Sequence, residues 1–596
     1  MKLRLLLGLL IGIPMFAIAQ WVDDPDVNTM VLGTEYAHTF PKIATTSDGN
    51  FYISSWRSVP DTNVYYEVWL QYLNHDGYVQ WGTDGVLISD NPSRSWISDY
   101  SLVTNPNGNA ILAFEDMRGG SGFSHVSVYS VAPDGHAVWD TNGIQLTTDP
   151  LMAFSPTICL TNSNNVLVAW NADISAKDTN AGIFIKVQKL SPAGVPLWTE
   201  PLTVAGPDSN YIFPNLMPVG TDDFIMVWQK KFEIGMGTGY EMFSYIYAMR
   251  FGADGSMVWP DVARICDHGD SAYVVPEFLK LRPVQDNNQG VYVTWFDGRS
   301  KNNFSNVYVQ HIDTSGKLQW PMNGIAVSPE NYGYDRVDPM VGLDPGNQDL
   351  FVFWEEYRAV GAFDSFGILG QKIKPDGSVA WGDLGKQMSV FIMDTMWYIE
   401  GVAPCPNNKF VLLMDQEYDS IVGPDTLLFD QLFATQIDTS GLQTWTKPTV
   451  LMAATRGTKF YPDLSDLSEN IFVVTWAENR DDAFNPNGVI LAQNISLNGQ
   501  LGPLGIPVYP ADESGILLYP NPTGSNSWLE FTEAVSGTVE VEVFNSFGQP
   551  IEHLTRSLDR ANYSIPLSAN RIPSGIYLLR VRFNEKEKVV RWVVLK

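Results

Sequence analysis

The chain has 596 residues, 45% of them hydrophobic and 12% aromatic, which excludes a disordered polymer and requires more than one domain. Its formal net charge is −29, and an acidic surface of this size repels phosphate groups, so we expect no nucleic-acid partner. The three cysteines are too few and too far apart for a disulfide framework, and we expect them to be buried apolar residues: Cys159, Cys266 and Cys405.

The first 19 residues have the features of a secretory signal peptide. Lys2 and Arg4 form the charged start, residues 5–16 are apolar, and small residues flank Ile18 as in a cleavage site. We therefore expect cleavage between Ala19 and Gln20. No later stretch reaches about 18 uninterrupted apolar residues, so we expect no transmembrane segment in the mature chain.

A tryptophan recurs through most of the chain at intervals of 58–64 residues, which is typical of a repeat architecture. The positions are Trp21, Trp81, Trp139, Trp198, Trp259, Trp320, Trp381 and Trp445. From the second Trp onward, a Gly precedes it in text such as NHDGYVQW or KPDGSVAW, and a Gly there indicates a hairpin turn. With the short apolar runs upstream, each repeat is expected to hold four strands, which we call A to D in chain order.

Four short strands, repeated about eight times without helical periodicity, predict an all-β fold over residues 20–510, a β-propeller of about eight four-stranded blades. Stacking the blades in a ring buries both faces of every sheet. Trp21 has no repeat before it, and the last repeat has no Trp after its turn. We therefore expect the segment near Trp21 to complete the blade formed by residues 462–498 and to close the ring. The alternative is that residues 504–509 supply that strand.

Residues 511–596 form a second predicted domain, a small antiparallel β-sandwich, because VEVEVF and YLLRVRF alternate with period two. Its motifs, in order, are Tyr519-Pro520-Asn521-Pro522, the turn at Gly548, and the turn and strand start containing Gly575 and Tyr577. They resemble the type A C-terminal sorting domain of the type IX secretion system of Bacteroidetes. The resemblance implies export, the type IX secretion machinery as a partner, and a secreted or outer-membrane surface location. The alternative is an adhesive sandwich that stays attached.

Strand B often ends in the same pattern: an aromatic residue, any residue, an acid, any residue and Arg. The acid and Arg pairs are Asp116 and Arg118, Asp297 and Arg299, Glu356 and Arg358, and Glu478 and Arg480. They could form a ligand-binding ring of Arg and carboxylate groups that holds an acidic sugar or carries out acid–base chemistry. Alternatively, each Arg pairs with an acid of its own or a neighbouring blade, and recurrence in several blades favours this. The segments after strand B are longer and more variable at 57–67, 173–181, 231–243 and 416–429, so we expect any site on that face.

Motifs of common enzymes are absent: the sequence has no G-x-S-x-G, no H-E-x-x-H, no Walker loop and no complete calcium loop. We therefore assign no catalytic residue and expect no metal site and no cofactor. The first hypothesis is a secreted binding or adhesion module for an extracellular glycan or protein. The alternative is a polysaccharide hydrolase or lyase that uses carboxylate and Arg residues on the B–C loop face. A third possibility is a structural component of the cell surface.

Overall fold

The computed structural model describes residues 21–594, except for 34–36, 60–64, 94–99, 119–121, 149–150, 174–181, 207–209, 237–238, 268–280, 300–303, 331–332, 361–362, 393–394, 423–424, 456, 480–484, 486, 503–515, 520–522, 524–525, 532–534, 536, 546–548, 559–563 and 584–585. The signal peptide and its cleavage site between Ala19 and Gln20 lie outside the described residues and stay predictions. The chain divides into two compact units, residues 1–503 and residues 504–596.

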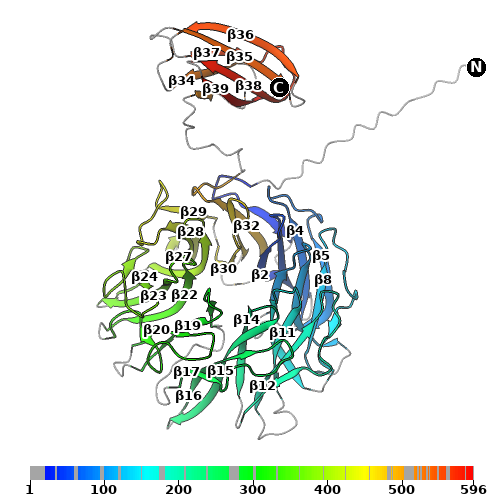
Figure 1. The fold of residues 1–596 in the computed structure, drawn as a ribbon, viewed down its shortest axis with the longest axis vertical. Helices are drawn as coiled ribbons and strands as arrows, with labels where there is room; N and C mark the ends of the chain where they lie inside the picture. The colour runs from blue at the N-terminus through cyan, green and yellow to red at the C-terminus, as the bar shows by residue number, and fades with distance from the viewer. Residues whose placement is uncertain are drawn as a thin grey trace, which may run out of the picture. The chain divides into compact units, whose positions relative to one another are not determined.

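Unit 1 is built from antiparallel sheets of four strands that follow one another around a ring, and its described residues form eight such sheets (Figure 1). We number them as blades 1–8 in chain order. Blades 1–4 consist of β2 (His38–Thr45), β3 (Phe51–Ser58), β4 (Tyr66–Leu73) and β5 (Val86–Ser93); β6 (Ser101–Thr104), β7 (Ala110–Asp116), β8 (His125–Val131) and β9 (Ile144–Gln145); β10 (Met152–Leu160), β11 (Val166–Asp173), β12 (Ile183–Leu190) and β13 (Leu202–Val204); and β14 (Tyr211–Val219), β15 (Asp223–Met236), β16 (Gly239–Phe251) and β17 (Ala263–Cys266).

Blades 5–7 consist of β18 (Val284–Gln285), β19 (Val291–Asp297), β20 (Asn306–Ile312) and β21 (Ile325–Ala326); β22 (Asp335–Leu343), β23 (Leu350–Val360), β24 (Phe363–Ile373) and β25 (Lys386–Gln387); and β26 (Thr395–Cys405), β27 (Lys409–Val422), β28 (Asp425–Ile437) and β29 (Thr449–Ala453). Blade 8 combines β30 (Lys459–Leu464), β31 (Ile471–Glu478) and β32 (Val489–Ser496) with β1 (Thr29–Leu32). This arrangement confirms the propeller fold.

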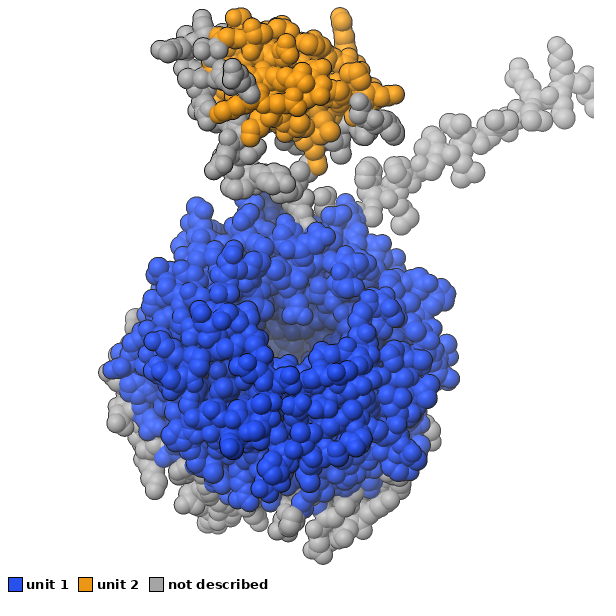
Figure 2. All heavy atoms as spheres, in the orientation of Figure 1, with its two compact units in different colours: residues 1–503 blue, residues 504–596 orange. Residues whose placement is uncertain are grey.

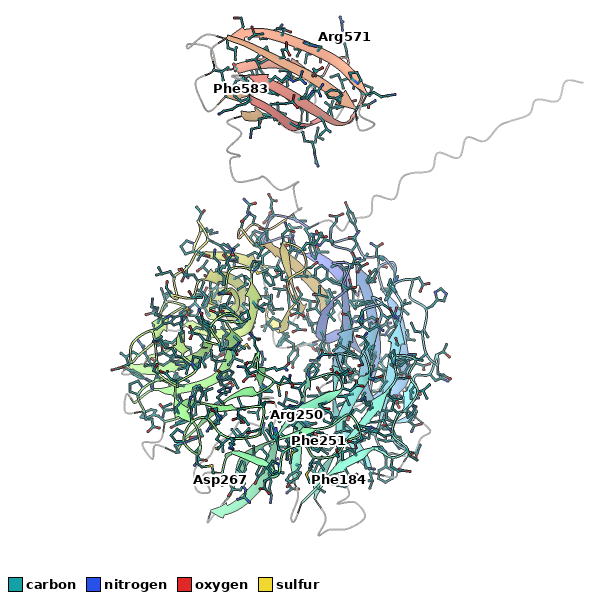
Figure 3. All side chains as sticks on the ribbon, in the orientation of Figure 1. Phe184, Arg250, Phe251, Asp267, Arg571 and Phe583 are labelled. Carbon is teal, nitrogen blue, oxygen red and sulfur yellow. The ribbon has the colours of Figure 1, made fainter. Side chains whose placement is uncertain are left out.

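The A strands are the innermost strands of the ring. β2 contacts both β6 and β30, β10 contacts β6 and β14, and β26 contacts β22 and β30. The B strands lie behind them, and every residue of β7, β19 and β31 is buried. Neighbouring blades cover both faces of these strands, which is why they appear in the sequence as continuous apolar runs. Side chains fill the space between the sheets (Figure 3), and one face of unit 1 is hollowed at its centre (Figure 2).

The N-terminal segment closes the ring, as predicted. β1 pairs antiparallel with β32, with Thr29 opposite Ala492, and so becomes the outer strand of blade 8. Trp21 is 1% exposed, and its indole Nε1 donates a hydrogen bond to the His75 carbonyl in blade 1 at 2.8 Å. The first and last parts of the propeller are therefore joined without a covalent link. The alternative strand, residues 504–509, lies outside the described residues.

The repeated Trp and Gly form the joint between neighbouring blades. A Cβ added to Gly316 would lie 2.7 Å from the Trp259 ring of the preceding blade. The Trp259 indole also donates to the Thr314 carbonyl in the same turn at 2.9 Å. The same pairing of ring and turn Gly recurs from Trp21 with Gly77 to Trp445 with Gly499. The regular spacing in the sequence therefore reflects a repeated contact between blades.

Replacing the turn glycine should weaken this joint. Gly316 has φ +86°, so Gly316→Ala combines backbone strain with a clash on Trp259, and we expect a loss of roughly 2–4 kcal/mol in urea unfolding. Gly82 is a matched control, because its φ is +79° and an added Cβ meets nothing within 4 Å. Gly82→Ala should cost only about 1 kcal/mol. Equal losses would show that the Trp contact contributes nothing.

Unit 2 is the predicted β-sandwich. One sheet contains β33 (Ile516–Tyr519), β34 (Asn526–Phe531) and β37 (Ser564–Ser568); the other contains β35 (Gly537–Asn545), β36 (Pro550–Leu558), β38 (Gly575–Phe583) and β39 (Lys586–Val594). Trp592 is fully buried between them, and its indole donates to the Ser527 hydroxyl at 2.9 Å. Tyr577 is buried and donates to the Pro573 carbonyl at 2.8 Å. The motif residues Pro520, Asn521, Pro522 and Gly548 lie outside the described residues.

Candidate functional site

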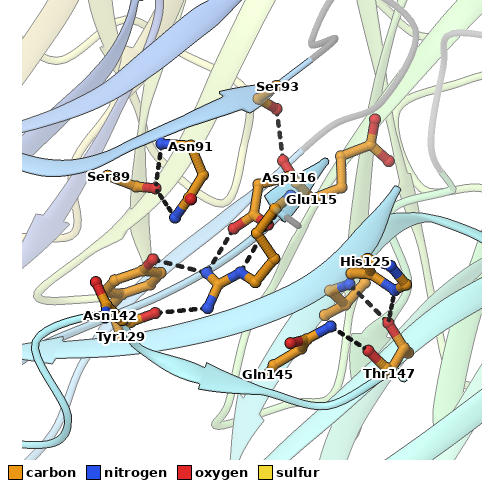
Figure 4. Close-up of polar contacts among 12 residues, drawn as sticks. Ser89, Asn91, Ser93, Glu115, Asp116, His125, Tyr129, Asn142, Gln145 and Thr147 are labelled. Carbon is orange, nitrogen blue, oxygen red and sulfur yellow. Dashed lines mark hydrogen bonds and ion pairs between the residues drawn. The ribbon is translucent and has the colours of Figure 1, made fainter. Parts of the chain in front are cut away.

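The predicted acid and Arg pairs are contacts within single blades. In blade 2, Arg118 donates to both carboxylate oxygens of Asp116, at 2.8 and 2.6 Å, to the Asn142 carbonyl at 2.7 Å and to the Tyr129 hydroxyl at 2.8 Å (Figure 4). In blade 5, Arg299 repeats the arrangement with Asp297 at 2.8 Å. Its guanidinium also lies 3.7 Å from the centre of the Tyr308 ring. Each Arg therefore ties the end of strand B to its own sheet.

In blades 6 and 8, the acid at the corresponding position pairs with a cation from strand A of the same blade. Glu356 accepts from Arg336 at 2.8 Å and from Arg358 at 2.6 Å. Glu478 lies 3.4 Å from the ammonium group of the fully buried Lys459. Arg480 lies outside the described residues. These contacts favour the interpretation that the recurring pairs fasten the blades, and a ligand role for them stays a prediction.

A pocket of about 200 Å³ lies where blades 5, 6 and 7 meet. Polar and apolar side chains from two A strands, two B strands and the segment before β18 line it: Leu281, Arg282, Thr294, Trp295, Phe296, Asp338, Pro339, Met340, Glu355, Tyr398, Ile399 and Glu400. None of these residues was predicted from the sequence to belong to a site. The recurring pattern predicted Glu356, whereas the preceding residue, Glu355, is the one that lines the pocket.

Bulges in the inner strands bring two of the acids to the pocket. The ladder between β22 and β23 shifts register between Val337 and Met340, and Asp338 sits in the shift with φ +50°. The ladder between β26 and β27 shifts between Ile399 and Gly401, around Glu400. A bulge redirects the side chain of its extra residue, and bulges are frequent next to active sites. At the position of Asp338, other blades carry uncharged residues: Phe40, Ser155, Phe213 and Tyr461.

Burial sets the protonation of these acids. It raises the pKa of Asp338 to about 6 and that of Glu400 to about 7, although the charge of Arg282 opposes both shifts. Burial and the charges of Asp338 and Glu400 also raise the pKa of Glu355 well above its ordinary value. Near neutral pH the pocket therefore holds carboxyl groups that can donate as well as accept protons.

A buried hydroxyl group points to a ligand. Thr294 is 2% exposed and lines the pocket, and its Oγ1 has no hydrogen-bond partner among the described residues. A polar group that is buried without a partner costs about 1–3 kcal/mol, so it calls for water or a bound molecule. Glu355 is engaged differently, because its Oε1 accepts a hydrogen bond from the backbone N–H of Ile399 at 3.1 Å.

A second group of buried acids makes stability depend on pH. Burial, the Asp430 charge and the Glu400 charge raise the pKa of Asp415, and burial raises that of Asp430 to about 6. An acid whose pKa is higher in the folded state binds more protons there, so stability is greatest at low pH and falls as the pH rises through the folded pKa. We expect these acids to make unfolding at pH 8 need less free energy than at pH 5, with about 1 kcal/mol of the difference from Asp430.

Asp415→Asn should narrow this difference by raising stability at pH 8, since Oδ1 of Asp415 is buried without a partner among the described residues. Asp376→Asn, in an exposed turn, should leave the difference unchanged. Urea unfolding at both pH values measures it, and a native protein more stable at pH 8 would contradict the expectation.

One part of the pocket leaves a signal in the sequence. The residue before Pro339 is the bulged acid Asp338. Asp tolerates the left-handed conformation better than most residues. Comparing that position across repeats would have separated the acid of blade 6 from Phe40 and Phe213.

Residues 517–596 match the family model described as the secretion system C-terminal sorting domain. No curated protein matches the chain. Among solved structures, the chain is similar to polysaccharide lyase Uly1, with 10% identity and a TM-score of 0.41 over 79% of this chain and 100% of that one. A protein of unknown function from Dyadobacter fermentans DSM 18053 shows 11% identity and a TM-score of 0.35, over 79% and 98%. An α-L-arabinanase of Penicillium chrysogenum, complexed with arabinobiose, shows 11% identity and a TM-score of 0.33, over 68% and 94%.

The sorting domain fixes where the protein acts. It implies engagement of the type IX secretion machinery, a Bacteroidetes origin, and a secreted or outer-membrane surface location. Within its described residues, the chain has no helix long and apolar enough to cross a membrane. The same residues hold no group of three or more His, Cys, Asp or Glu placed to bind a metal ion.

Proposed function

We propose that the exported propeller binds an uncharged extracellular glycan and holds one sugar unit in the pocket between blades 5, 6 and 7. The observation that carries the proposal is the Thr294 hydroxyl, which lacks a partner in the described part of the chain and lies in the same pocket as Asp338, Glu400 and Arg282. Sugar hydroxyls donate and accept hydrogen bonds, so they can satisfy all of these groups together. A pocket of about 200 Å³ suits one unit of a chain rather than a larger ligand.

The lining also selects among sugars. Trp295, Phe296 and Tyr398 offer aromatic surface to the apolar face of a ring. Three carboxyl groups stand against one Arg, so a sugar acid would meet like charges whenever these groups ionise. A neutral glycan avoids this repulsion, and its extracellular location fits that of the exported protein.

The test is a binding screen with the mature protein on neutral polysaccharides (arabinan, galactan, xylan, mannan and laminarin) and acidic ones (pectate, alginate and carrageenan). We expect binding to a neutral polymer, weakened at least about tenfold by Arg282→Gln. Arg358→Gln is the matched control, because Arg358 lies outside the pocket and pairs with Glu356. Loss of binding in Arg358→Gln alone would place the site on the recurring Arg and acid pairs and overturn the proposal, as would binding to acidic polymers only.

A further inference from the structure

We propose that the pocket hydrolyses the glycan it binds, with Glu400 as the proton donor and Asp338 as the proton acceptor. This inference rests on the proposed function and adds a reaction to it. Both side chains line the same pocket, and each comes from a bulge in one of two inner strands, β22 and β26, that contact each other. The bulge at Asp338 does not itself require an acid, because other blades have Phe, Ser or Tyr at that position.

The surroundings give the two acids different states. Burial raises the pKa of Asp338 to about 6 and that of Glu400 to about 7, so near neutral pH Glu400 is the acid that more often carries a proton. The charges that act on Glu400 are those of Arg282, Asp338 and Asp430. Two carboxyl groups whose pKa values are separated by their environment are the pattern used by enzymes that break glycosidic bonds.

Glu355 is a positioning residue. Its Oε1 accepts a hydrogen bond from the backbone N–H of Ile399, the residue before Glu400, at 3.1 Å. It therefore fixes the strand on which the donor sits. Thr294 lies on the blade 5 side of the pocket, and its hydroxyl, which has no partner among the described residues, can bind a sugar hydroxyl.

The reaction balances with water alone. The Glu400 carboxyl proton passes to the glycosidic oxygen as the bond from that oxygen to the anomeric carbon breaks. The oxygen of a water molecule bonds to the anomeric carbon, and the proton that it loses passes to the Asp338 carboxylate. Glu400 ends as a carboxylate and Asp338 as an acid, and proton exchange with solvent restores both.

The experiment measures both binding and release of new reducing ends from the polysaccharide that binds the mature protein. We expect Glu400→Gln and Asp338→Asn, which keep shape, to slow release at least about 100-fold while affinity changes less than about threefold. The matched control is Asp376→Asn, which removes the carboxylate of an exposed turn that does not line the pocket and should keep the activity.

An aryl glycoside with a good leaving group separates a proton donor from a merely structural residue. Glu400→Gln should lose much less activity on this substrate than on the polysaccharide, whereas Asp338→Asn should lose as much on both. Binding without new reducing ends would overturn the inference and leave the proposed function standing. Unsaturated products, or full activity in Glu400→Gln, would also overturn it. If no polysaccharide binds, both proposals fail.

Discussion

Removing residues 20–33 from the mature protein is expected to open the ring. This segment contributes the fourth strand of blade 8 and places Trp21 on the turn of blade 1. Trp21, Val31 and Leu32 are each at most 1% exposed. Loss of one buried Trp alone costs about 3–5 kcal/mol, so we expect the truncated protein to lose at least about 5 kcal/mol of stability in urea unfolding.

A synthetic peptide of residues 20–33 should restore part of this stability when added to the truncated protein, because the ring closes without a covalent bond. Met30→Ser is the control within β1, since Met30 is 49% exposed and should be replaceable at little cost. Unchanged unfolding of the truncated protein would contradict a stabilising role for the closure.

The fold could be predicted from the sequence because its signals are local and repeated. The joint between Trp259 and Gly316 recurs in chain order, so the spacing of Trp residues directly reports one blade after another. Ring closure could be predicted because Trp21 has no repeat before it and the last repeat has no Trp after its turn. The alternation of VEVEVF predicted β35, in which Val539, Val541 and Val543 are buried.

The site could not be predicted in the same way, because it depends on register and on contacts between blades. Asp338 and Glu400 reach the pocket through bulges, and a bulge is a shift between two strands that neither strand shows alone. The variable segments also differ from expectation. Residues 231–243 and 416–429 were expected to be loops, but β15 pairs with β16 as far as Met236, and β27 pairs with β28 as far as Val422.

The recurring Arg and acid pairs contribute to stability in blade 6, where we expect Glu356→Ala to be severely destabilising. Arg336 is 1% exposed and donates to Glu356 at 2.8 Å, to Asn306 at 3.2 Å and to the Pro329 carbonyl at 2.6 Å. Removing Glu356 leaves a buried guanidinium without its carboxylate, which costs about 3–5 kcal/mol.

Two further variants distinguish the free-energy cost of the unpaired buried charge from the cost of lost side-chain packing. Arg358→Ala removes the half-buried partner of Glu356 and should cost at most about 1 kcal/mol. The double variant Arg336→Met with Glu356→Leu removes both buried charges, and it should recover most of the stability lost in Glu356→Ala, because the desolvation cost of the pair disappears with it. If the double variant is no more stable than Glu356→Ala, shape rather than charge makes this position costly. In that case, side-chain packing at the end of strand B, and not the ion pair, would explain why the acid and Arg recur in the sequence.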